Sequence, residues 1–232
     1  MQVDCNKALL IRLIGEFSAT AMLMCLLPIA CISYAKFPHN LLQISIGCGI
    51  VIGACVQCFS CVSGSHINPC LSIAACIVGK MSIPDMFFYI IMQYTGAFAG
   101  YGIYVLIIPW NMVEENPCYT IPHKDVSNLR CFGIEFILTS TLVLFFLGCI
   151  DPRNGSHTET FPLRFAHVIC GIAYFTGASV NPARSLPPAV VFNEFKSMWV
   201  YYLSHLLSAT SMGCAWRFIF GQLPDNKSHQ EE

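Results

Sequence analysis

The chain has 232 residues, of which 55% are hydrophobic and 11% charged, and its formal net charge is −1. An ordinary soluble domain carries about 25% charged residues, so this composition predicts a membrane protein. The near-neutral charge, without any block of lysines and arginines, argues against a nucleic-acid partner and against a polybasic membrane anchor.

Six hydrophobic segments are predicted to cross a membrane as helices, because a hydrocarbon core of ~30 Å needs about 20 apolar residues. In chain order they lie at about 13–34, 41–62, 86–107, 131–150, 161–178 and 198–220, and the fifth is the shortest. The first is expected to be a span and not a signal peptide, since no small-residue cleavage site precedes a polar mature sequence. The sequence therefore predicts an all-α membrane protein with one domain over residues 1–232.

Lysines and arginines near the span ends indicate the orientation. Seven lie on the N-terminal side (Lys7, Arg12, Lys80, Arg153, Arg164, Arg217, Lys227) and four on the other (Lys36, Lys124, Arg130, Lys196). Because cytoplasmic loops carry the excess of basic residues, both termini and a tail at 221–232 are predicted to be cytoplasmic. The N-glycosylation patterns at Asn154 and Asn226 fall on that side and are expected to stay unmodified.

Fourteen cysteines stand in the sequence, most of them inside apolar segments. There a cysteine behaves as a small hydrophobic residue, so packing is expected and not a disulfide framework. Cys55, Cys58 and Cys61 have a spacing that iron–sulfur ligands also use. On a continuous helix such steps drift around the axis, so no metal and no cofactor are expected.

An internal repeat organises the chain. The segments GSHINPC at 64–70 and GASVNPAR at 177–184 align at a constant offset of 113 residues. Glu16 and Glu135, in the first and fourth spans, align at an offset of 119. Three spans per repeat is an odd number, so the second copy is inverted in the membrane, an arrangement typical of transport proteins. The repeats lie at about 9–108 and 129–220.

Each Asn-Pro pair precedes about ten residues of helix-forming character, which is too short for a span. Asn is a good N-cap and Pro suits the first helical position, so Asn68-Pro69 and Asn181-Pro182 are predicted to begin two re-entrant half-helices. Irregular backbone at membrane depth is tolerated where it is buried or lines water. A single Asn-Pro usually marks a turn or kink, but a matched pair in inverted repeats favours two half-helices meeting at a pore centre.

The motifs resemble those of the aquaporin (major intrinsic protein) family over residues 9–220. They are SGSHINP at 63–69, NPARS at 181–185, MQYTGA at 92–97, GEF at 15–17 and WVYYL at 199–203. The resemblance implies a channel, not an enzyme, that passes water or small neutral solutes and excludes ions and protons. It also implies a homotetramer in a plasma or vesicle membrane, with one pore in each subunit.

Within this resemblance the two boxes form the pore centre, where the asparagine amides donate to a passing water and the dipole ends oppose protons and cations. The pore-centre residues are Asn68, Pro69, Cys70, Asn181, Pro182 and Ala183. Carbonyls ahead of the boxes are expected to line the pore, from Gly64, Ser65, His66, Ala178, Ser179 and Val180. Cys70 replaces the usual Ala, and it either packs beside the midplane, narrows the junction or offers a thiol to the pore.

Charged residues at membrane depth need a role, because they are costly there. Arg184 is expected to donate hydrogen bonds to the permeant and to repel cations. The resemblance implies that Glu16 and Glu135 each accept hydrogen bonds from the Asn-Pro loop of their own repeat. A proton relay is the alternative for the two glutamates, although no chain of Asp, Glu and His links them.

Counting back from the asparagines places the narrowest ring at Cys48, Ile169, Ala178 and Arg184. Water channels of the family usually have Phe and His at the first two positions, so this ring is predicted to be wider and less polar. It should then admit glycerol or urea besides water. Other positions resemble the water-selective branch, so strict water selectivity stays open: Ser185, Ala189, Tyr201 and Tyr202.

Two histidines affect this prediction. His167 and Ile169 differ by ~200° around a helix, so only one of them can face the pore, and Ile169 is favoured. His205, where the family often has Pro, is expected to be an ordinary buried or interfacial residue.

Two other classes of protein are alternatives to an open channel. An intramembrane enzyme is disfavoured, because the sequence has no H-E-x-x-H motif and no nucleophile beside a plausible base. A closed family member with a junction or structural role is not separated from a channel by sequence, but osmotic swelling would separate them.

Overall fold

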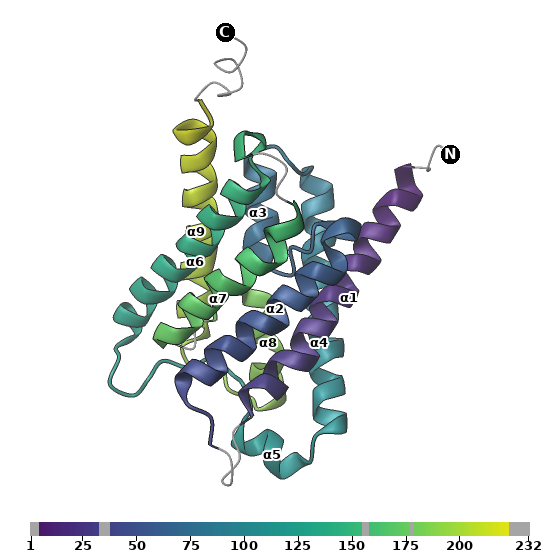
Figure 1. The fold of residues 1–232 in the computed structure, drawn as a ribbon. Coiled ribbons are helices and arrows are strands. Elements are labelled where there is room, and N and C mark those ends of the chain that lie inside the picture. The colour runs from purple at the N-terminus through teal and green to yellow at the C-terminus, as the bar shows by residue number, and fades with distance from the viewer. Residues whose placement is uncertain (1–4, 33–37, 155–157, 177–178, 223–232) are drawn as a thin grey trace.

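The computed structural model describes residues 5–32, 38–154, 158–176 and 179–222, and all regular structure in these ranges is helical. Six long helices form a bundle that encloses two short ones (Figure 1). The long helices are α1 (Cys5–Cys31), α2 (Leu41–Ser63), α4 (Ile83–Ile107), α6 (Asn128–Ile150), α7 (Phe161–Thr176) and α9 (Met198–Phe218). A further short helix, α5 (Trp110–Glu115), lies between α4 and α6 in the chain.

By length and composition, α1, α2, α4 and α6 are suited to cross a membrane. α7 is apolar but only 16 residues long, and α9 has 21 residues and is more polar. Large apolar side chains lie on the outside of the bundle, such as Leu106 at 84% and Leu129 at 78% exposure. Such a surface suits contact with lipid, and the predicted all-α membrane fold is confirmed.

The helix ends follow from local sequence. Asn40 and Gln43 form a reciprocal capping box at the start of α2, which satisfies two backbone amides. α2 ends where Gly64 takes a φ of 86°, a left-handed conformation that glycine adopts without strain. Ser82 and Ser127 cap α4 and α6 in the same way as Asn40, each by accepting a bond from a backbone amide.

The two half-helices are α3 (Pro69–Ile77) and α8 (Pro182–Val191). Asn68 caps α3 by accepting from the Cys70 amide, and Asn181 caps α8 by accepting from the amides of Ala183 and Arg184. α3 lies toward the end of the bundle where α1 begins, whereas α8 lies toward the other end (Figure 1). Their N-terminal ends therefore approach each other inside the bundle.

Glycines allow the long helices to pack closely. A Cβ on Gly96 or Gly100 of α4 would lie 2.4 Å from the Phe17 carbonyl oxygen or 2.1 Å from that of Ala21, both in α1. A Cβ on Gly49 of α2 would lie 2.5 Å from the carbonyl oxygen of a residue in α7. Small residues at such contacts bring backbones together, which is the usual way in which membrane helices associate.

The cysteine spacing in α2 does not build a cluster. Cys55 is fully buried, whereas Cys58 and Cys61 are exposed. Across the part of the chain that the structure describes, no group of three or more His, Cys, Asp or Glu side chains could hold a metal ion.

Candidate functional site

The two Asn-Pro boxes are joined by a reciprocal pair of hydrogen bonds, which we call the asparagine clasp. The Nδ2 of Asn68 donates to the carbonyl of Val180 at 2.8 Å, and the Nδ2 of Asn181 donates to the carbonyl of Ile67 at 2.8 Å. The Oδ1 of each asparagine meanwhile caps its own half-helix. Each amide Nδ2 carries a second hydrogen, which the clasp leaves free for another acceptor.

The residue before each asparagine has an unusual backbone. Ile67 has a φ of 48° and Val180 a φ of 44°. β-Branched residues rarely enter this left-handed region, and such strain costs about 1–3 kcal/mol per residue. The clasp holds the carbonyl of each of these residues by a hydrogen bond. These bonds keep both residues in the strained conformation, at the same point of both repeats.

Buried glutamates hold the amide side of the same loops. The Glu16 carboxylate, fully buried in α1, accepts from the backbone amides of His66 and Ile67 at 2.9 Å each. It also accepts from the Ser63 hydroxyl at 2.7 Å and from the Gln93 Nε2 at 2.8 Å. These four donors compensate for removing a carboxylate from water.

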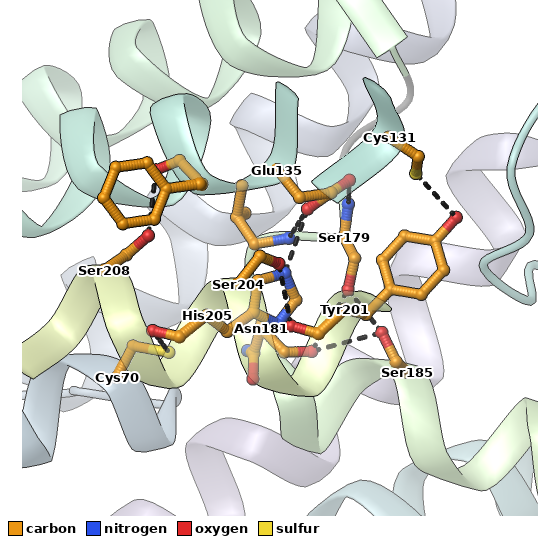
Figure 2. A network of polar contacts seen from close by, with 12 residues as sticks. Cys70, Cys131, Glu135, Ser179, Asn181, Ser185, Tyr201, Ser204, His205 and Ser208 are labelled. Atoms are coloured by element: carbon orange, nitrogen blue, oxygen red, sulfur yellow. Dashed lines mark hydrogen bonds and ion pairs between the residues drawn. The ribbon is translucent and has the colours of Figure 1, made fainter. Parts of the chain in front are cut away.

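Glu135 of α6 has the equivalent place in the second repeat (Figure 2). Its carboxylate accepts from the amides of Ser179 at 3.0 Å and Val180 at 3.1 Å. The third bond comes from the Nε2 of His205 at 2.9 Å. Because a carboxylate offers no proton, this contact assigns the hydrogen to Nε2 of the imidazole.

His205 in α9 and Gln93 in α4 are thus counterparts, because each reaches the glutamate of its own repeat from the third long helix. His205 is fully buried, and its Nδ1 has no hydrogen-bond partner among the described residues. The expectation of an ordinary buried histidine missed this role. Its signal was the spacing, since Gln93 and His205 are 112 residues apart, close to the offset of the two boxes.

A cavity runs along the clasp toward Arg184. Asn68, Asn181 and His66 line it, and so do Arg184, Cys31 and Cys48. The rest of the wall is mostly aliphatic: Leu23, Leu27, Ile44, Ile52, Leu71, Leu142, Ile169, Ile172 and Ala173. Water held in such a cavity would meet few polar groups.

A second cavity lies next to the first Asn-Pro loop, whose residue His66 borders both cavities. Gly64 lines the second cavity. The second is also bordered by Phe146, whose ring meets His66 edge-on at 5.1 Å, and by Arg164 and Glu159. His66, which precedes the clasp residue Ile67, is the residue that the two cavities share.

The predicted ring residues that are described lie together on the first cavity. Cys48, Ile169 and Arg184 all line it, whereas Ala178 falls outside the described residues. His167 is exposed on α7, away from Ile169, which is buried at the cavity wall.

Arg184 is buried at the head of α8. Its Nη2 donates to the Cys118 Sγ at 3.5 Å, and its Nη1 has no hydrogen-bond partner in the described part of the chain. Sequence reasoning missed Cys31 and Cys118 here, because they come from the end of α1 and from the loop after α5.

Some of the residues whose carbonyls are predicted to line the pore border the first cavity, and others do not. Ser179 and Val180 line the first cavity, and the Val180 carbonyl already accepts from Asn68. A carbonyl oxygen has two lone pairs, so one remains. Ser65 is 2% exposed and its hydroxyl donates to the Cys55 carbonyl at 3.3 Å.

A bundle of membrane helices with two half-helices meeting head to head beside a cavity defines an α-helical membrane channel. The sequence model of the family described as Major intrinsic protein matches residues 5–216. The chain therefore belongs to the major intrinsic protein family, which consists of membrane channels and not of enzymes.

Two relatives illustrate the match. Aquaporin-2 of Rattus norvegicus is 33% identical over 225 residues, covering 94% of this chain and 81% of that protein. Aquaporin-4 of Notomys alexis is 33% identical over 187 residues, which is 79% of this chain and 57% of that longer protein. The structure of an aquaglyceroporin from Plasmodium falciparum superposes with a TM-score of 0.81 at 20% identity, over 91% of this chain and 97% of that one.

Proposed function

We propose that the chain is a passive channel for water that also passes small neutral solutes such as glycerol and urea and excludes ions and protons. The asparagine clasp is the observation that carries the proposal. It fixes two amide donors on the cavity, at the N-terminal ends of two opposed half-helices.

The clasp suits water and opposes cations. Each Nδ2 has one hydrogen left, so a water at the midpoint can accept from both asparagines and turn its own hydrogens away from its neighbours in the file. The N-terminal ends of α3 and α8 add positive potential at this point. Together these features break a hydrogen-bonded chain of waters and repel cations, and Arg184 adds a full positive charge farther along the path.

The ring residues support passage of solutes larger than water. Cys48 and Ile169 are smaller or less polar than Phe and His, so a carbon backbone can lie against Ile169 while hydroxyl groups bond to the free Nη1 of Arg184. The spare lone pair of Val180 and the carbonyls of Gly64, Ser65, His66 and Ser179 would offer acceptors. These contacts would offset part of the hydration that a solute loses on entry.

We further propose a homotetramer in a plasma or vesicle membrane, with cytoplasmic termini and with the two inverted repeats as its halves. The equivalent contacts of Glu16 and Glu135 support the repeat. α1 begins and α9 ends at the same end of the bundle, as an even number of crossings requires (Figure 1).

Stopped-flow light scattering of proteoliposomes tests this function. An osmotic step with an impermeant sugar should give water flow well above that of empty liposomes, and glycerol or urea gradients should give re-swelling. Cys48→Phe with Ile169→His should abolish solute uptake and leave water flow largely intact. Exclusion of both solutes by the unmodified protein would show a strictly water-selective channel, and no water flow at all would favour a structural role.

A further inference from the structure

Three cysteine thiols gather where the first cavity approaches Arg184, and we call them the thiol cluster: Cys31, Cys48 and Cys118. The Sγ atoms of Cys31 and Cys48 are 3.9 Å apart. Cys31 also contacts the thiol of Cys118, which in turn accepts from Arg184. The cluster therefore connects α1, α2 and the loop after α5 to the cation at the cavity.

Cys31 and Cys48 differ from a packed cysteine such as Cys55. Both line the cavity and both are partly exposed, whereas Cys55 is fully buried. Both residues therefore border the space in which a small neutral molecule would move. Arg184 places a positive charge near the Cys48 sulfur, and a neighbouring positive charge favours the thiolate form of a cysteine.

The backbones of α1 and α2 lie close together next to these two sulfurs. Gly47 and Ala30, the residues that precede Cys48 and Cys31, touch across the α1–α2 contact. A Cβ on Gly47 would lie 3.2 Å from the Ala30 Cβ and 4.0 Å from its Cα. A disulfide has an S–S bond of about 2.05 Å, so the two sulfurs, now 3.9 Å apart, would have to approach each other by about 1.9 Å.

We propose that Cys31 and Cys48 form a pore-lining dithiol that hydrogen peroxide oxidises reversibly to a disulfide, and that this modification lowers conduction. The effect on conduction rests on the proposed channel function, whereas the modification itself does not. Hydrogen peroxide belongs to the class of small neutral solutes that the path would admit.

The chemistry is a balanced two-electron exchange. One thiolate attacks a peroxide oxygen, so that an S–O bond forms, the O–O bond breaks, and the departing hydroxide takes up the thiol proton as water. The second thiolate then attacks this sulfenic sulfur, the S–O bond breaks, and a second water leaves. The dithiol loses two electrons and the peroxide gains them, and an added thiol reductant reverses the change.

Oxidation would change the contacts of Cys118, the thiol that accepts a hydrogen bond from Arg184. Cys31 would turn from Cys118 toward Cys48, so the thiol that holds the guanidinium would lose its neighbour. The guanidinium, whose Nη1 already lacks a partner among the described residues, would then be free to project into the path. Arg184 already lines the cavity, so a shift of its side chain from the wall toward the middle would narrow the space left for water.

Peptide mass spectrometry of the whole protein in proteoliposomes tests the modification directly. After treatment with hydrogen peroxide and alkylation of remaining thiols, a Cys31–Cys48 cross-linked peptide should appear and should disappear after reduction with dithiothreitol. No cross-link, or one that joins Cys48 to Cys170 or Cys31 to Cys118 instead, would overturn the assignment. This readout does not depend on whether the protein conducts.

Stopped-flow water flux on the same samples tests the consequence. Peroxide should reduce flux at least two-fold in the unmodified protein and in Cys58→Ser, a control that removes an exposed thiol of α2. Cys31→Ser and Cys48→Ser should each be insensitive to peroxide. Equal sensitivity in all four proteins, or a cross-link without any change in flux, would refute a role in conduction.

Discussion

At the scale of single residues, the second repeat differs from the first in the donor that supports its glutamate. Gln93 holds Glu16, whereas His205 holds Glu135. Ser208 of α9 donates to the Phe136 carbonyl at 2.8 Å, which keeps α9 against α6 next to this pair (Figure 2). His205 is therefore a positioning residue: it acts on the Asn-Pro loop through Glu135.

Replacing His205 separates hydrogen bonding from packing. His205→Leu leaves the Glu135 carboxylate one donor short in a buried place, so we expect a loss of about 1–3 kcal/mol in stability. We also expect a lower water flux, because the second loop loses part of its anchor. His205→Gln copies the first repeat and should restore both properties.

Thermal unfolding in detergent and stopped-flow flux in liposomes measure these effects. Gln93→Leu serves as the matched change in the first repeat and should behave as His205→Leu does. If His205→Leu unfolds at the same temperature and conducts like the unmodified protein, the positioning role is wrong.

At the scale of elements, the half-helices could be predicted, because the two residues Asn-Pro supply both the cap and the first residue of a helix. Hydropathy predicts the first span at about 13–34, whereas α1 begins at Cys5, because hydropathy marks the apolar part of a helix and not its polar first turns. α5 was not predicted at all, since its six residues carry no side-chain cap. The contacts of His205 and of the thiol cluster depend on which helices become neighbours in the bundle. A local sequence pattern does not predict which helices these are.

The ends of α6 and α9 are joined by Asp151, which follows α6 directly. Its carboxylate pairs with the Arg153 guanidinium at 2.6 Å and accepts from the Trp216 indole at 3.1 Å. A carboxylate at a helix C-terminus is unfavourable by itself, so these partners matter. The hydrogen bonds from Arg153 hold the pKa of Asp151 well below its usual range, against the opposing effect of burial.

The sign of the pH dependence follows from this depressed pKa. The folded protein binds this proton more weakly than the unfolded chain does, so the contribution to stability is complete above the unfolded pKa of about 3.9 and is lost as pH falls through the folded value. Asp151→Asn should therefore lower the melting temperature at pH 7, and the difference should shrink below pH 4. A difference that stays constant from pH 7 to pH 3 would show that charge is not its source.

At the scale of the whole molecule, α1 begins and α9 ends at the same end of the bundle (Figure 1). Only two orientations in the membrane are therefore possible, with that end on the cytoplasmic side or on the opposite side. The excess of lysines and arginines near that end predicts that it is cytoplasmic. Asn154 then lies where glycosylation does not occur.

Expression in a glycosylating cell checks the orientation. The unmodified protein should show no change in mass after glycosidase treatment. A variant with Lys124→Asn and Val126→Thr creates an acceptor pattern in the opposite loop and should carry a glycan. A glycan on Asn154 would mean that the orientation is reversed.

The asparagine clasp also constrains when the pore can exist during synthesis. The first re-entrant loop needs the Asn181 side chain to hold the Ile67 carbonyl, yet the ribosome makes Asn181 113 residues after Asn68. At roughly 5–20 residues per second this delay is about 6–23 s. The half-made protein therefore sits in the membrane with an unfinished loop, and it cannot leak water or ions through a completed path before its second half has been inserted.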